Sequence, residues 1–169
     1  MLNIYDSFLG KLTKTLRTLL AVIFILCLII GVTQVLCRYI LPFNFAWTNE
    51  ITVYGFVWMS MIGAAIAAGE KGHIAMDFIR VKLKGRARKY LELLIYISSL
   101  TAFFILTYYG TILTLRNIIQ LSPVMRISMA IPYAAVPFGS LCIIIYTLRH
   151  LLEVFEKSET KRSEVKVHG

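Results

Sequence analysis

Long apolar stretches without a charged residue recur four times along the chain. They cover residues 18–37, 51–69, 93–115 and 127–148, which is 20, 19, 23 and 22 residues. Even the shortest, 19 residues, makes about 28 Å of helix, close to the roughly 30 Å hydrocarbon core of a bilayer. Because lipid offers the backbone no hydrogen-bond partners, each stretch is expected to be an α-helix. The pattern therefore predicts an all-α membrane protein with four transmembrane helices.

The segments outside these stretches are amphipathic or polar. Residues 1–17 carry apolar side chains at helical spacing, which indicates either an interfacial helix leading into the first span or a frayed terminus. Residues 72–92 are expected to form a basic helix on the membrane surface, and residues 153–169 a polar tail. The chain thus divides into an N-terminal segment, a four-helix domain over residues 18–152, and the tail. The cations expected to face lipid headgroups are Arg80, Lys84 and Arg88.

Composition and charge support a membrane protein and predict its orientation. The chain is 58% hydrophobic and only 16% charged, too apolar for a water-soluble domain of 169 residues. Fifteen of its 18 Lys and Arg residues precede the first span, lie between the second and third, or follow the fourth. Under the positive-inside rule both termini are then cytoplasmic. The excess of positive charge, a net +9, is explained by this orientation in the membrane, so nucleic acid is not an expected partner.

The chain lacks the residue patterns that catalysis or ion transport would need. No apolar stretch contains an ionisable side chain, and no phosphate loop, metal-ligand spacing or nucleophile with an adjacent base occurs. His73 and His150 fall at cytoplasmic span ends and His168 in the tail, so no pair faces across the helices to hold haem. Internal inverted repeats are not evident. The sequence predicts neither an enzyme nor a cofactor or metal site, but a component that lends structure to a partner.

The second apolar stretch carries small residues at steps of three and four. Such a row leaves one side of a helix nearly bare and lets another helix approach closely. Two interpretations stay open, a contact with another subunit and packing against the chain's own helices. The row consists of Ser60, Gly63, Ala64, Ala67 and Ala68.

Polar residues at the ends of the second stretch predict two local contacts. Arg38 and Glu50 are expected on the same periplasmic rim, where they would form an ion pair unless Glu50 pairs with a cation of a partner. Gly72 is a natural helix stop, and His73 and Asp77 are expected to hold the turn after it unless both are simply solvated.

Two prolines begin the fourth stretch. Pro132 fits the opening turn of a helix, whereas Pro137 frees a backbone carbonyl inside the helix and is expected to bend it.

Taken together, these motifs resemble one family. They are Arg38-Tyr39, Trp47-x-x-Glu50, Tyr54, Trp58, Gly63-Ala64-Ala65, Gly72-His73-Ile74 with Asp77, Ser122-Pro123, Ile131-Pro132 and Pro137-Phe138-Gly139. The set resembles the small membrane subunit of the tripartite ATP-independent periplasmic (TRAP) transporters, the DctQ family, over residues 19–152. The chain departs from the family at Asn49-Glu50, where two adjacent acids are common, so Glu50 would act alone.

The resemblance implies a multi-pass protein of the bacterial inner membrane that braces a larger, sodium-driven transport subunit. A soluble periplasmic protein would deliver the substrate, an organic acid such as a dicarboxylate or a sialic acid. The alternative is a four-helix anchor of another complex: a redox complex would need haem, and a small efflux pump would need a carboxylate within the membrane. The residues expected to contact a partner or to support the structure are Arg38, Trp47, Glu50, Trp58, Gly63, Ala64, Ala67, His73, Asp77, Pro132, Pro137 and Gly139.

Overall fold

A computed structural model describes the backbone of residues 2–40, 46–82 and 86–167. Side chains are described for residues 9–40, 46–70, 90–91 and 93–152. The described backbone is helical apart from residues 117–129 and Ala134, and it contains no strand, only one isolated bridge, which confirms the predicted all-α class. The helices are α1 (Leu2–Ile40), α2 (Ala46–Lys82), α3 (Arg86–Arg116), the short α4 (Ala130–Tyr133) and α5 (Ala135–Val167).

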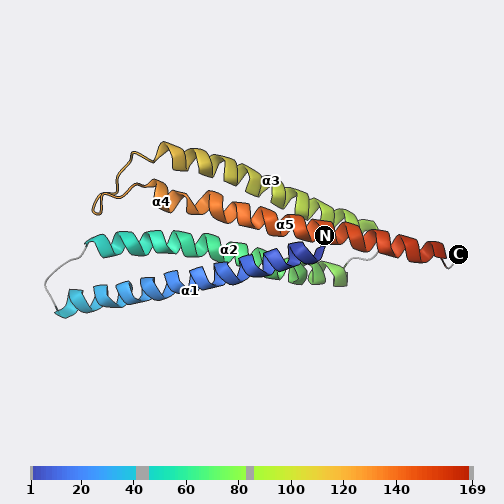
Figure 1. The fold of residues 1–169 in the computed structure, drawn as a ribbon, viewed down its shortest axis with the longest axis horizontal. Coiled ribbons are helices and arrows are strands. Elements are labelled where there is room, and N and C mark those ends of the chain that lie inside the picture. The colour runs from blue at the N-terminus through green and yellow to red at the C-terminus, as the bar shows by residue number, and fades with distance from the viewer. Residues whose placement is uncertain (1, 41–45, 83–85, 168–169) are drawn as a thin grey trace.

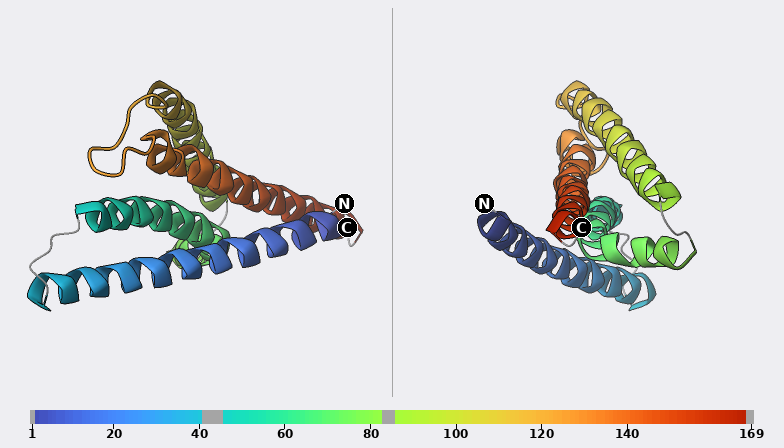
Figure 2. Two further views of the ribbon diagram at one scale, coloured as in Figure 1. Left: turned by 60° about the vertical axis from the view of Figure 1, so that its left-hand side comes forward. Right: turned by 90° about the vertical axis from the view of Figure 1, so that its right-hand side faces the viewer.

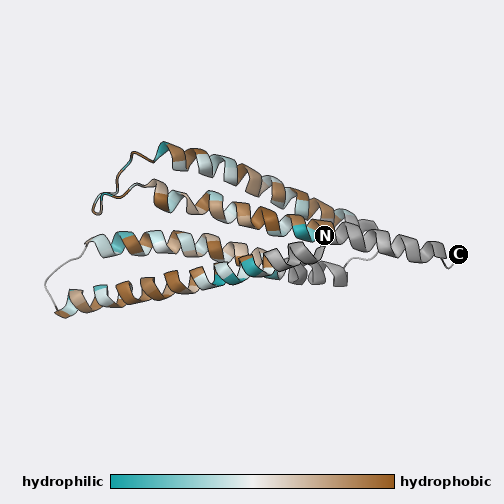
Figure 3. Ribbon diagram, viewed as in Figure 1, coloured by the Kyte–Doolittle hydropathy of each residue, from teal (hydrophilic) through white to brown (hydrophobic). Residues whose placement is uncertain are grey.

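Four of these helices are long and apolar enough to cross a membrane. The spanning segments are Leu9–Ile40, Ala46–Glu70, Leu93–Arg116 and Ala130–Leu152. Apolar residues run along their length, and hydrophilic ones gather toward the ends (Figure 3). The predicted number of spans is therefore confirmed.

The long helices form an open row. α2 packs against α1 on one side and α5 on the other, and α5 packs against α3, as Figures 1 and 2 show. α5 is the central helix: half of its most apolar window is buried, compared with 6% for α1. Both termini lie toward the same end of the row as the end of α2 and the beginning of α3 (Figure 1). Residues 117–129 lie at the opposite end.

The main apolar core lies in the half of the row nearer the termini. Leu9 and Leu16 of α1 are almost fully buried there against Ile62 and Ile66 of α2 and Tyr146 of α5. The Tyr146 hydroxyl and Thr13 Oγ1 are 2.7 Å apart. Since Thr13 Oγ1 already donates to the Leu9 carbonyl, the tyrosine is the donor. The apolar side of the N-terminal segment thus packs within the chain.

Glycines mark the points where the helices approach most closely. A Cβ on Gly139 of α5 would lie 2.7 Å from the Met61 Cβ of α2, and a Cβ on Gly110 of α3 would lie 3.1 Å from the Val136 Cγ1. A Cβ on Gly55 of α2 would overlap the Cys27 Sγ of α1. Each pair of neighbouring helices in the row therefore approaches closely at a glycine, and the approach is tightest against backbone at Gly139.

Pro132 lies in an opening turn as predicted, Pro137 lies in the first turn of α5 after a break in the helix, and Gly72 does not end α2. Pro132 lies buried in the four-residue α4, and helix is interrupted at Ala134, three residues before Pro137, which lacks the N–H that would continue it. α2, in contrast, runs without interruption through Gly72 to Lys82. A glycine costs about 1 kcal/mol inside a helix, so a long helix tolerates it, and the predicted helix stop at Gly72 is wrong.

Candidate functional site

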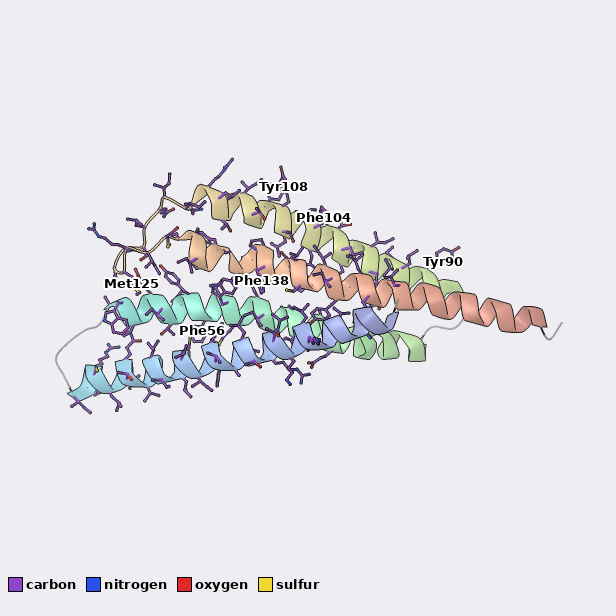
Figure 4. The ribbon with its side chains drawn as sticks, viewed as in Figure 1. Phe56, Tyr90, Phe104, Tyr108, Met125 and Phe138 are labelled. Carbon is purple, nitrogen blue, oxygen red and sulfur yellow. The ribbon has the colours of Figure 1, made fainter. Side chains whose placement is uncertain are left out.

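Glu50 links the beginning of α2 to the connection between α3 and α4. Its carboxylate accepts hydrogen bonds from the Ser122 hydroxyl at 2.9 Å, the Val124 N–H at 2.9 Å and the Met125 N–H at 3.0 Å. Two successive backbone N–H groups pointing at one anion form a small anion-binding concavity. A side chain 72 residues away in sequence therefore fixes the tip of this connection, where Met125 lies beside the start of α2 (Figure 4).

The connection is itself a tight hairpin. The Ser122 N–H donates to the Ile127 carbonyl and the Met129 N–H to the Gln120 carbonyl, each at 2.8 Å. The turn closes at Arg126, whose φ of 54° lies in the left-handed region that non-glycine residues seldom adopt. We call residues 117–129 the hairpin. Because several of its backbone N–H groups donate to carbonyls within the hairpin or to Glu50, the hairpin has a defined conformation.

Two more side chains of α2 continue the contact that Glu50 begins. Tyr54 donates its hydroxyl to the Met129 sulfur at 3.3 Å, and the Trp58 indole N–H donates to the Ile131 carbonyl at 3.2 Å. The Trp58 ring also lies 5.7 Å from the ring of Phe138. Glu50, Tyr54 and Trp58 are spaced by four residues and so form one row along α2. We call these three residues the clamp.

The predicted ion pair between Arg38 and Glu50 is wrong. Where side chains are described, the ion pair that occurs joins Arg17 to Glu70 at the other end of α1 and α2. Glu50 instead uses both carboxylate oxygens on the hairpin. Three donors of the hairpin converge on the Glu50 carboxylate, whereas an exposed guanidinium is well solvated by water and gains little from an ion pair. Arg38 remains exposed in the last turn of α1.

Pro137 and Gly139 lie where α5 meets both of its neighbours. Gly139 allows the contact with Met61 of α2, and the Pro137 ring lies near Gly110 of α3. One turn further on, the Thr107 hydroxyl of α3 donates to Ser140 Oγ at 2.8 Å. Both residues therefore support the helix row from inside.

The small-residue row of α2 does not pack within the chain as a whole. Ala68 contacts the core, but Gly63 has nothing within 4 Å of the place where a Cβ would be, and Ala64 is exposed. Ala67 is half-buried. Packing against the described part of the chain's own helices therefore does not explain Gly63, and its contact with another subunit stays a prediction.

The other predicted residues divide into two groups. Trp47 lies in the first turn of α2 and is 42% exposed. The side chains of the remaining ones, at the end of α2 nearer the termini and in the basic segment, lie outside the described residues, so their predicted roles stay predictions. They are His73, Asp77, Arg80, Lys84 and Arg88.

The clamp was only partly visible in the sequence. The spacing of Glu50, Tyr54 and Trp58 by four residues was a signal that they share one side of a helix. Their partners were not visible, because two of the three hydrogen bonds to Glu50 come from backbone N–H groups, which every non-proline residue possesses.

Four apolar spanning helices, held in an open row by glycine crossings and the clamp, define a multi-pass membrane protein with large outward surfaces. Comparison with known sequences gives the family. The sequence profile of the tripartite ATP-independent periplasmic transporters, DctQ component, matches residues 27–157. The chain belongs to this family, as its motifs indicated. It is a small membrane subunit of a TRAP transporter and a multi-pass protein of the bacterial inner membrane.

The chain is similar to two curated proteins, one of which carries the name of this family. The chain is 29% identical over 106 residues to the C4-dicarboxylate TRAP transporter small permease protein DctQ of Vibrio cholerae, matching 62% of this chain and 45% of that protein. It is 30% identical over 138 residues to the uncharacterized protein y4mM of Sinorhizobium fredii, matching 78% of this chain and 26% of that protein. The chain thus spans less than half the length of either relative.

Proposed function

We propose that this chain braces the large, multi-span subunit of a TRAP transporter that takes up an organic acid with a sodium gradient. The observation that carries this proposal is the openness of the helix row. α1, α2 and α3 bury only 6%, 17% and 11% of their most apolar windows. A complete secondary transporter would hold ionisable groups in its interior. Among the described residues the buried polar side chains are instead four hydroxyls and His150 at the end of a span.

The outward side of α2 is the proposed contact with the large subunit. Ser60 and Ala64 are exposed, and Gly63 between them has open space in front of its Cα. In lipid, burial of apolar surface does not drive the association of helices. Small residues instead let the backbone of a partner helix come close enough for van der Waals contact. α3 offers a second surface, because Phe104 and Tyr108 point away from the rest of the row (Figure 4).

The hairpin is the proposed docking platform for the periplasmic binding protein. It lies at the end of the row away from the termini (Figure 1), which is the periplasmic side if both termini are cytoplasmic. Ile119 is 91% exposed, and Arg126 is exposed as well. The clamp supports this surface from below, which would give a soluble partner a rigid apolar and cationic target.

The substrate class rests on the relatives. The Vibrio cholerae relative is named for C4-dicarboxylates, so a dicarboxylate is the first candidate, with sialic acids as the other class expected for this family. The residues that select the substrate would then belong to the large subunit and the binding protein. The cations at the cytoplasmic end of α2 and in the basic segment, Arg80, Lys84 and Arg88, are proposed to contact anionic lipid headgroups.

Reconstitution in liposomes tests the proposal. The large subunit, this chain and the binding protein together should take up a C4-dicarboxylate when a sodium gradient is applied, and omission of this chain should abolish uptake. Uptake by this chain alone would contradict the bracing role. Uptake of equal rate without this chain would also contradict it.

A further inference from the structure

An apolar groove runs along the seam between α1 and α2. Its volume is ≈ 540 Å³, within the roughly 300–1,000 Å³ typical of ligand sites. Phe24, Gly31 and Val35 of α1 form one wall, and Thr52 and Phe56 of α2 form part of the other. Phe56 is labelled on the side of α2 that faces α1 in Figure 4.

The walls of the groove offer an occupant almost nothing to hydrogen-bond. Thr52 is the polar hydroxyl in the lining, and it already donates to the Thr48 carbonyl at 2.8 Å. Gly31 contributes open space, since a Cβ there would meet no atom within 4 Å. The chemistry that fits such walls is a saturated hydrocarbon chain.

The groove has the depth of one leaflet. On α1 it extends from Phe24 to Leu36, a rise of about 18 Å, and half of a hydrocarbon core of roughly 30 Å is about 15 Å. Toward the middle of the membrane it ends at Phe24 of α1 and Met59 of α2, about one turn past the contact of Gly55 with Cys27. A spanning helix of a partner would need a groove through both leaflets, whereas an acyl chain needs one.

Polar groups lie at the mouth of the groove. Arg38 follows Val35 by one turn on the same side of α1, and Asn49 precedes Thr52 by one turn on the same side of α2. Both are exposed, and Arg38 has no ion-pair partner among the residues whose side chains are described. A guanidinium at the end of one wall and an amide donor at the end of the other suit the phosphate of a lipid headgroup.

We propose that this groove binds one phospholipid of the periplasmic leaflet. An acyl chain lies between α1 and α2 against Gly31 and Phe56, and the phosphate pairs with Arg38 and Asn49. The lipid then fills the open seam between the two helices, along α1 from Phe24 to Leu36.

Native mass spectrometry of the full chain, purified in mild detergent, tests the site. We expect wild-type protein to retain one phospholipid per chain, and Gly31→Leu, which fills the groove, to lose it. Gly63→Leu is the matched control, because it also places a leucine into open space on a spanning helix but outside the groove, and it should keep the lipid. Absence of a retained lipid in wild type, or equal retention in both variants, would overturn the proposal.

A second measurement separates a lipid from a protein occupant in the assembled transporter. A photoreactive benzophenone amino acid at Phe56, an aromatic position of similar shape, should give an adduct with the mass of a phospholipid after illumination of cells. Arg38→Gln combined with Asn49→Ala should reduce that adduct while the chain stays folded. A protein adduct at Phe56, with the large subunit or with a second copy of this chain, would show that a helix occupies the groove and would overturn the lipid assignment.

Discussion

The two sides of α2 have opposite surroundings, although each lies at a point where small residues allow a helix to approach closely. On the inward side, Ile62 and Ala65 are completely buried, and Met61 touches the backbone of α5 at Gly139. On the outward side, a Cβ at Gly63 would have no atom within 4 Å, and Ala64 is exposed. Small residues therefore indicate that a helix can come close, but only the arrangement of the helices tells whether that helix belongs to the same chain.

Gly139→Leu is expected to have the largest effect, because it breaks the inward side. Its side chain would start 2.7 Å from the Met61 Cβ and 3.1 Å from the Met61 carbonyl oxygen, and the backbone there cannot rotate away. Overpacking of this kind costs about 3 kcal/mol or more. Folded yield and thermal unfolding in detergent measure it. Gly63→Leu, its counterpart on the outward side, should not lower stability, because the leucine enters open space and replaces a glycine in a helix interior. Equal losses in the two variants would refute the distinction between the sides.

Glu50→Ala should have the next largest effect, on the end of α2 that the clamp holds. It leaves the Ser122 hydroxyl and two backbone N–H groups without their acceptor, and the hairpin loses its anchor. We expect a lower midpoint of thermal unfolding and faster hydrogen exchange at Val124 and Met125. Glu50→Gln, which keeps one acceptor oxygen, should lose less. Unchanged exchange at both amides in Glu50→Ala would rule out the clamp.

Tyr146→Phe tests the inward core with a smaller change. It removes only the hydroxyl that donates to Thr13, a bond worth about 1 kcal/mol. In a double-mutant cycle with Thr13→Val, the two single losses of stability should add up to more than the loss in the double variant. The difference should be about 1 kcal/mol, the energy of this hydrogen bond. If the two losses simply add in thermal unfolding, the bond does not contribute.

Arg17→Gln should have the smallest effect. The ion pair with Glu70 links α1 and α2 next to the same core, but the two side chains are 61% and 46% exposed. Exposed pairs contribute about 0 to 1 kcal/mol and weaken as salt is added. A loss above this range, unchanged at high salt, would mean that the pair is more protected than its exposure indicates.

The sequence was informative about elements and less so about their neighbours. Four charge-free stretches of about twenty residues identify spanning helices directly, because lipid permits little else for such a backbone. Pro137 indicated a local irregularity of the fourth spanning helix for a similarly local reason, its missing N–H. The structure has a break at Ala134. These features depend only on the residues concerned.

Contacts between distant residues could not be predicted in the same way. Gly63 and Gly139 look alike as glycines in apolar stretches, yet one faces open space and the other a backbone. Glu50 was expected to form an ion pair with Arg38, but its carboxylate accepts hydrogen bonds from backbone N–H groups of the hairpin instead. The deciding fact in each case is which segment lies opposite, and that comes from the fold.

Recovery of the large subunit with this chain tests the central claim most directly. Tagged wild-type chain, purified from membranes that contain the large TRAP subunit, should bring that subunit with it in a fixed ratio. Gly63→Leu should fold with wild-type stability and yet recover much less of the large subunit, because the added side chain stands where the partner helix would pack. Full recovery of the large subunit with Gly63→Leu would contradict the assignment of the outward side of α2 as the partner surface.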